Sequence, residues 1–217
     1  MPYLADLARQ SADPEVKLDI YVTCGIFVAN QSAVNSGQLP GELDLHDPPL
    51  AEELIQEIYT AYLAAVVSLG KLSEEILRYA EAAEKDDDEK RYIITADAAY
   101  RGDLAVAVML LTYSDGDEYI VGCPKCHEDM YIWPTESGPG MTAYPEDPVF
   151  SSKENGRMVE PSVPDTVRSG DDALARLWQA AIAIKNRQLL EQLPYLSGRV
   201  SCPSCGEPLE IWPELVR

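Results

Sequence analysis

Basic residues are scarce in this chain of 217 residues, which has 17 Lys and Arg against 37 Asp and Glu and a formal net charge of −20. Affinity for nucleic acids depends largely on Lys and Arg side chains that neutralise phosphates, and anionic membranes attract the same side chains. The shortage of positive charge therefore argues against nucleic acid and membrane surfaces as partners. An acidic surface attracts basic proteins instead. The alternative interpretation of the negative charge is that it serves solubility alone.

Long apolar runs and common catalytic motifs are also missing. No segment reaches the roughly 18 uninterrupted apolar residues of a membrane helix, and residues 1–13, with Asp6 among them, do not resemble a signal peptide. The sequence contains no GxSxG, P-loop, GxGxxG or HExxH motif. We therefore expect a cytoplasmic protein without catalytic or cofactor-binding residues, and an enzyme is the alternative.

Helical patterns dominate the first half of the sequence, so that the expected fold class is mainly α with a helical body in residues 1–117. Helices are predicted over residues 2–10, from Pro14, from Asp47-Pro48-Pro49 to Gly70, from Ser73, over 92–100 and over 103–113. The apolar run Leu104–Leu111 could instead form a buried strand. The acidic excess lies in this half, because residues 1–121 hold 23 acidic and 8 basic residues, whereas residues 122–217 hold 14 and 9.

Four of the five cysteines form two CxxC pairs, which in a reducing compartment favours a metal site over disulfides. The first pair lies in Gly122–Pro134, GCPKCHEDMYIWP, and the second in Ser201–Pro213, SCPSCGEPLEIWP. Seven of the thirteen positions are identical, so the chain contains an internal repeat. Short apolar segments flank each pair, which predicts two small hairpins, each with two cysteines at its turn.

The predicted metal ligands are Cys123, Cys126, Cys202 and Cys205. Zinc accepts four thiolates tetrahedrally at about 2.3 Å, and sites with four cysteines are usually closed and structural. One structural zinc ion is therefore expected, and iron in a rubredoxin-like site is the alternative. A redox-active CxxC pair is a further alternative, but such a pair normally opens a helix, and here a strand is expected after each pair.

The knuckle Cys202-Pro203-Ser204-Cys205-Gly206 matches the CPxCG pattern of zinc ribbons, and the chain resembles that family over about 30 residues. The first knuckle departs from the pattern at His127, where a turned backbone is expected. The resemblance implies a ribbon split between residues 118–134 and 199–213, because 75 residues separate Cys126 from Cys202. It also implies that Trp133 and Trp212 pack beside the metal. The 118–217 domain then contains an insertion, with an irregular loop at 134–170 and a helical pair at 171–194.

Other chemically notable residues have simpler interpretations. Cys24 lies on an apolar helix and is expected in the core. His46 is expected in a surface loop, and His127 should point away from the metal, its alternative role being a ligand. The run Asp86-Asp87-Asp88-Glu89 is expected on a solvated face, because it lacks the spacing of a calcium loop.

Residues Pro2–Ala29 resemble a HEAT-type helix pair, with a short Leu-bearing helix followed by Asp13-Pro14-Glu15-Val16-Lys17. This resemblance implies a short stack of helices, an architecture that mostly binds other proteins. Together with the acidic charge, it favours a non-catalytic adaptor, inhibitor or immunity-type protein for a basic protein partner. The alternatives are an enzyme or enzyme subunit with a structural zinc and a site near 134–170, and a rubredoxin-like iron electron carrier.

Overall fold

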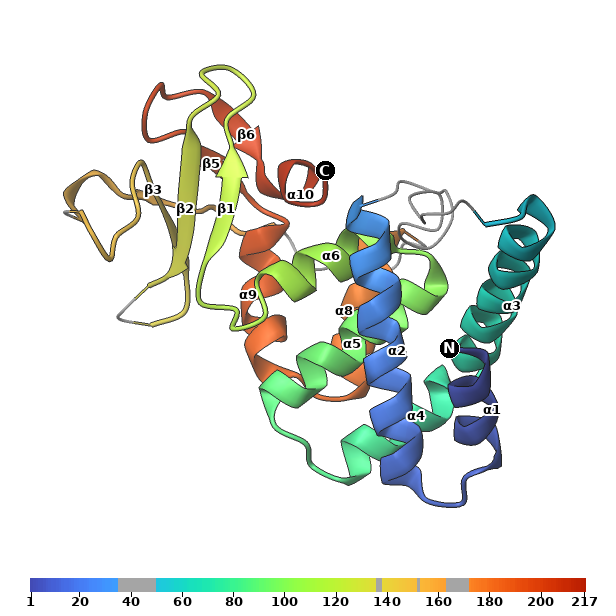
Figure 1. Cartoon of the computed structure of the whole chain (residues 1–217). Coiled ribbons are helices and arrows are strands. Elements are labelled where there is room, and N and C mark those ends of the chain that lie inside the picture. Colours follow the sequence, from blue (N-terminus) through green and yellow to red (C-terminus); the bar gives the residue numbers. More distant parts are fainter. Residues whose placement is uncertain (35–49, 136–137, 152, 163–171) are drawn as a thin grey trace. The chain divides into compact units, whose positions relative to one another are not determined.

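The structure is a computed structural model that describes residues 1–34, 50–135, 138–151, 153–162 and 172–217. The chain forms two compact units, Met1–Leu111 and Thr112–Arg217 (Figure 1). Helices dominate the described residues, and the strands form small antiparallel sheets, so the predicted mainly α fold is confirmed. None of the helices in the described ranges combines the length and the apolar character needed to cross a bilayer.

The first unit is built from helices, and the boundary to the second unit falls at the end of α6. These helices are α1 (Pro2–Gln10), α2 (Pro14–Val34), α3 (Glu52–Gly70), α4 (Ser73–Ala82), α5 (Asp87–Arg101) and α6 (Leu104–Thr112). The run Leu104–Leu111 is therefore helical. The turn before α2 is held by Asp13, whose carboxylate accepts the Glu15 N–H at 2.9 Å.

The predicted start of α3 is wrong in detail, whereas α4 begins at Ser73 as predicted. α3 begins at Glu52, because the backbone of Ala51 is still extended after the two prolines; the residues 35–49, which include Asp47 and His46, lie outside the described residues. Leu72 occupies the cap position of α4. The Ser73 hydroxyl is 2.7 Å from the hydroxyl of Tyr21 on α2.

The acidic run Asp86-Asp87-Asp88-Glu89 opens α5, and Asp86, Asp88 and Glu89 are exposed to solvent as expected. The Asp86 side chain accepts the Glu89 N–H at 2.8 Å, and the Glu89 side chain accepts the Asp86 N–H, which forms a reciprocal capping box. The carboxylates of the first turn also stabilise the positive end of the helix. α5 ends at Gly102, whose φ of 82° places it in the left-handed conformation typical of helix C-termini.

The core of the first unit centres on the crossing of α2 and α5. At Gly25 an added Cβ would lie only 2.3 Å from the Cβ of Ala96, so the two backbones approach as closely as a glycine permits. Near this crossing the rings of Tyr21 and Tyr100 are 4.8 Å apart, and the Tyr100 hydroxyl donates to the Tyr21 carbonyl at 2.7 Å. Cys24 is fully buried here, as expected for a core residue.

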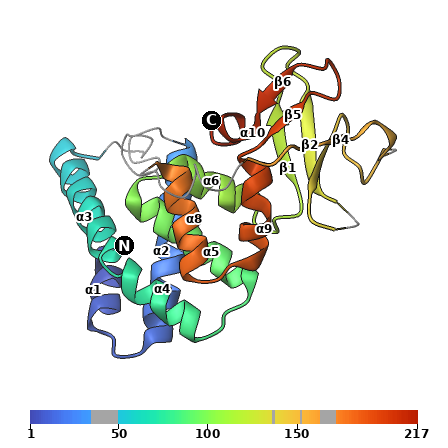
Figure 2. The same cartoon turned by 180° about the vertical axis from the view of Figure 1, so that it is seen from behind.

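The second unit contains two antiparallel sheets and helices (Figure 2). The first sheet has the order β1 (Tyr119–Gly122), β2 (Asp129–Pro134), β3 (Met141–Tyr144) and β4 (Arg157–Met158), and the second pairs β5 (Arg199–Ser201) with β6 (Pro208–Glu210). A 3₁₀ helix (Lys153–Asn155) precedes β4, and the α-helices are α8 (Ala173–Ala183), α9 (Arg187–Leu196) and α10 (Ile211–Leu215). Hydrogen bonds of 2.8 and 2.9 Å between Glu160 and Arg199 connect the two sheets.

The prediction of an irregular loop over residues 134–170 is wrong for part of that stretch. β3 pairs with β2, and its residues Met141 and Ala143 are fully buried. The backbone pairing of Glu160 with Arg199 requires a glycine at position 198, because an added Cβ there would lie 2.1 Å from the Glu160 carbonyl oxygen. The inserted chain therefore contributes strands to the structure that the two cysteine hairpins form.

α9 ends later than the sequence expectation of a helical pair over residues 171–194. Asn186 caps it by accepting the Leu189 N–H at 2.8 Å. Pro194 was expected to end the helix, but α9 continues through it to Leu196. Proline in a helix removes one backbone donor; the Pro194 carbonyl accepts the Ser162 N–H at 2.8 Å, which links α9 to the segment after β4.

The close approach of α2 and α5 predicts the effect of one methyl group. Gly25→Ala should lower the free energy of unfolding of the first unit by about 1–3 kcal/mol through overpacking, although alanine is the better helix former. The measurement is urea unfolding followed by far-UV circular dichroism. Gly70→Ala is the matched control, because its Cβ would meet Tyr100 at an ordinary 3.4 Å; equal effects of the two substitutions would contradict the account.

Candidate metal centre

The two CPxC segments form the turns of two hairpins with the same backbone geometry. In the β1–β2 hairpin, the Cys123 N–H donates to the Glu128 carbonyl at 2.9 Å, and the His127 N–H donates to the Cys123 carbonyl at 2.9 Å. In the β5–β6 hairpin, both bonds recur at 2.8 Å, from Cys202 to Glu207 and from Gly206 to Cys202. The internal repeat in the sequence is therefore a structural repeat at the cysteines.

The residue after the second cysteine adopts a left-handed backbone in both hairpins. Gly206 has a φ of 78°, and His127 has a φ of 62°. The turned backbone expected at His127 is thus present, in a conformation that costs a non-glycine residue roughly 1–2 kcal/mol. The His127 side chain is exposed and is not part of the cysteine cluster.

The four cysteines lie together, although Cys126 and Cys202 are far apart in the sequence. Their Sγ atoms all lie within 4.8 Å of one another, with 3.7 Å between Cys123 and Cys205 and 3.8 Å between Cys126 and Cys202. Four sulfurs at about 2.3 Å from a tetrahedral zinc ion are about 3.8 Å apart. The donor set and its spacing therefore fit one tetrahedral metal ion.

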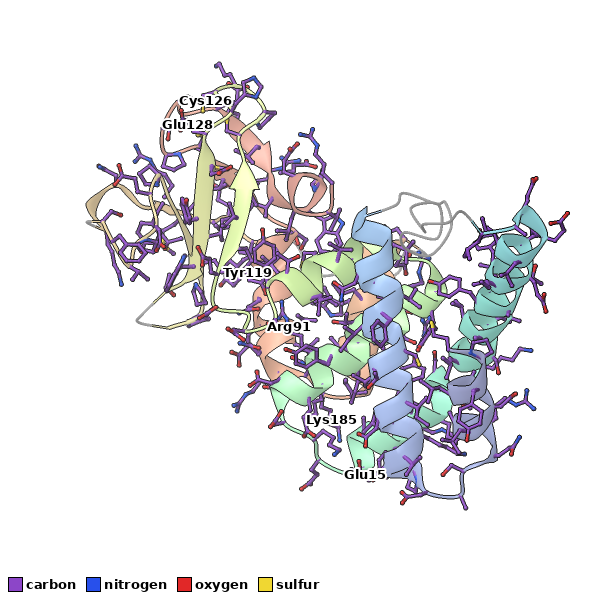
Figure 3. All side chains as sticks on the ribbon, in the orientation of Figure 1. Glu15, Arg91, Tyr119, Cys126, Glu128 and Lys185 are labelled. Carbon is purple, nitrogen blue, oxygen red and sulfur yellow. The ribbon has the colours of Figure 1, made fainter. Side chains whose placement is uncertain are left out.

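The cluster has a buried side and an open side. Cys123 and Cys202, the first cysteine of each pair, are 1% exposed, whereas Cys126 is half-buried and Cys205 is exposed. Figure 3 shows Cys126 and Glu128 at the end of the β1–β2 hairpin. The ion pair between Lys125 Nζ and Glu207 Oε2, at 2.6 Å, joins the two hairpin turns. The two turns are thus held together by side chains beyond the four cysteines.

The crowded thiols of Cys123 and Cys126 have different pKa values. Burial raises the pKa of the Cys123 thiol, but the backbone N–H groups of Cys126 and Lys125 stabilise its thiolate and hold the pKa at about 7. At Cys126 the Glu128 N–H lowers the pKa, while burial and the neighbouring sulfurs raise it to about 12. The peptide groups therefore favour one thiolate, and its negative charge opposes ionisation of the next thiol.

The two copies of Ile-Trp-Pro have different structures. In the first copy they end strand β2, which pairs with β3 along Ile132–Pro134. In the second copy a strand follows the cysteine pair as expected, but β6 ends at Glu210 and Ile211 begins α10, so that Ile-Trp-Pro is helical. Trp133 and Trp212 are both half-buried, each in a different type of secondary structure.

A second feature of this unit is a cavity of about 390 Å³ beside the β4–β5 connection. Arg157, Glu160, Arg199 and Ser201 contribute to its lining, which includes no cysteine or histidine. Arg199 is tied to Glu210 by a 2.7 Å ion pair. The polar part of the lining is thus two guanidinium groups, one carboxylate and one hydroxyl.

Comparisons with protein-family models, with curated proteins and with solved structures found no match to this chain.

His127 and Gly206 occupy equivalent left-handed positions, so that adding a glycine at one and removing the glycine at the other should change the stability in opposite directions. His127→Gly should raise the stability of the second unit, and Gly206→Ala should lower it by about 1 kcal/mol, because only glycine adopts this backbone without strain. All three tryptophans lie in this unit, so urea unfolding followed by tryptophan fluorescence reports on it directly. Changes of the same sign in both variants would contradict the assignment.

Proposed function

We propose that Cys123, Cys126, Cys202 and Cys205 bind one structural zinc ion in a split zinc ribbon. The supporting observation is that their four sulfur atoms lie within 4.8 Å of one another, on two hairpins with the same backbone hydrogen bonds. Four thiolates complete the coordination of zinc and leave no open position for water or substrate, so the ion's role is to stabilise the fold. A reducing compartment such as the cytoplasm keeps these thiols available to the metal.

The zinc ion contributes to folding because its ligands come from distant parts of the chain. Closing a loop of 75 residues costs entropy that grows only with the logarithm of its length. Structural zinc binding contributes roughly 10–16 kcal/mol in small domains, which exceeds that cost. The ion would thus keep both hairpins in place around β3, β4 and the inserted helices.

The proposed activity is binding of a basic protein partner by the helical unit. Residues 1–111 carry 20 acidic and 8 basic residues, a net charge of −12. Six of those eight basic residues form ion pairs with carboxylates of the same unit, namely Arg9, Lys17, Arg78, Lys85, Lys90 and Arg101. The positive charges are therefore engaged internally, and the surplus of carboxylates attracts a basic partner and speeds its encounter.

The architecture of the helical unit supports the same proposal. α1 and α2 form a helix hairpin whose turn is held by Asp13 and Pro14, the residues that carry the HEAT-type resemblance. Helical arrays of that type use their surfaces to bind other proteins. We therefore assign the chain the role of an acidic adaptor, inhibitor or immunity-type protein, with zinc as a structural component.

The metal proposal predicts a binding stoichiometry that depends on specific cysteines. The purified chain should carry one zinc ion by native mass spectrometry, and Cys123→Ser should lose it together with the folded tryptophan fluorescence of the second unit. Cys24→Ser is the matched control, because Cys24 lies in the first unit and should leave metal content unchanged. If the purified protein is red and contains iron, the electron-transfer alternative is favoured over structural zinc. If the protein is folded without any metal, the proposal is refuted.

The partner proposal predicts strong dependence on salt. Proteins captured from a lysate at about 50 mM salt should be basic, and most should be released at about 500 mM salt, where the Debye length falls to a few ångströms. Quantitative mass spectrometry of both fractions gives the comparison. Captured partners that are acidic, or that remain equally bound in high salt, would contradict an electrostatic interface.

A further inference from the structure

A cavity of about 470 Å³ opens between α2 and α5 of the helical unit. Its lining comes from Leu18–Ile26 of α2 and from Lys85–Ile93 at the start of α5. All of these residues belong to the first unit, so the groove is a feature of the acidic part of the chain.

The two helices that line the groove are held together at two separate places. One place is the crossing at Gly25 and Ala96, where the backbones nearly touch. The other is Lys85, whose Nζ lies 3.3 Å from a carboxylate oxygen of Glu15 and 3.2 Å from one of Glu89. This ion-pair bridge joins the N-terminal ends of the two helices and sits at the groove wall.

The groove has an apolar floor and an acidic rim. Leu18 and Ile93 are 5% and 1% exposed and form its deepest part. Further apolar walls are half-buried, and they are Val22, Ile26 and Tyr92. Asp19 and Glu89 line the cavity as exposed carboxylates. Lys85 also lines the cavity and pairs with Glu15 and Glu89, so that these three side chains together keep one negative charge, to which Asp19 adds a second.

We propose that this groove binds a basic amphipathic helix of the protein partner. Apolar side chains of such a helix, spaced at i, i+3, i+4 and i+7, would cover the floor, and flanking Lys or Arg would meet the rim carboxylates. A second copy of this chain is the less suitable occupant, because it carries a net charge of −20. The inference rests on the proposed binding of a basic partner and specifies where that partner docks.

The test uses a synthetic, fluorescently labelled Leu/Lys peptide with one apolar helical face, and a scrambled peptide of the same composition as the probe control. Binding is measured by fluorescence anisotropy at about 0.15 M salt, where the Debye length is about 8 Å. Thr23→Arg places bulk and positive charge at an exposed groove position. Thr60→Arg makes the same substitution at an exposed position of α3 that does not line the groove.

Thr23→Arg should weaken binding of the amphipathic peptide about tenfold or more, and Thr60→Arg should change it less than about twofold. Both variants should keep the wild-type melting temperature, since both positions are exposed. The proposed binding site would be refuted if peptide binding weakened equally in both variants or in neither. It would also be refuted if the protein did not prefer the amphipathic peptide over the scrambled one. None of these outcomes affects the salt-dependent capture of basic partners, so failure of the groove is distinguishable from failure of the proposed function.

Discussion

The crowding of four cysteine sulfur atoms, which opposes the ionisation of more than one thiol, is the constraint around which we interpret the second unit. The Sγ atoms lie within 4.8 Å of one another, and two thiolates at about 4 Å repel by about 4 kcal/mol at an effective dielectric constant near 20. A divalent cation at their centre converts that repulsion into attraction. Both hairpin turns meet at this point, where the ion pair of Lys125 with Glu207 joins them.

The helical unit is stabilised in a different way, by close contact between α2 and α5. Gly25 allows the backbones to approach at Ala96, and the tyrosines and aspartate beside this crossing form a buried network. Asp97 is 2% exposed and is neutralised by Arg101 at 2.8 Å. Since basic side chains serve such internal ion pairs, the surface keeps its acidic surplus. The same helix crossing also leaves the groove whose floor is apolar and whose rim is negative.

Spacing predicted the cysteine site and both hairpin turns, because two CPxC segments with matched flanks impose one local geometry. Local patterns failed where tertiary contacts decide the outcome. Ile-Trp-Pro forms a strand where β3 is available to pair with it and begins a helix where Glu214 and Arg217 follow, paired at 2.6 Å. Arg91 lies in a dense charge cluster in the sequence and yet is 1% exposed, with its Nε donating to the Leu110 carbonyl at 3.4 Å. β3 could not be recognised among prolines and glycines, because its stability comes from pairing with β2.

The central claim is that a metal ion at the four cysteines holds the second unit together while the helical unit folds without it. Hydrogen–deuterium exchange of the intact chain before and after treatment with a strong zinc chelator tests this claim most directly. The account predicts rapid exchange throughout β1, β2, β5 and β6 after chelation, with the protection of α2 and α5 unchanged. Unchanged protection of the four strands in metal-free protein would contradict it.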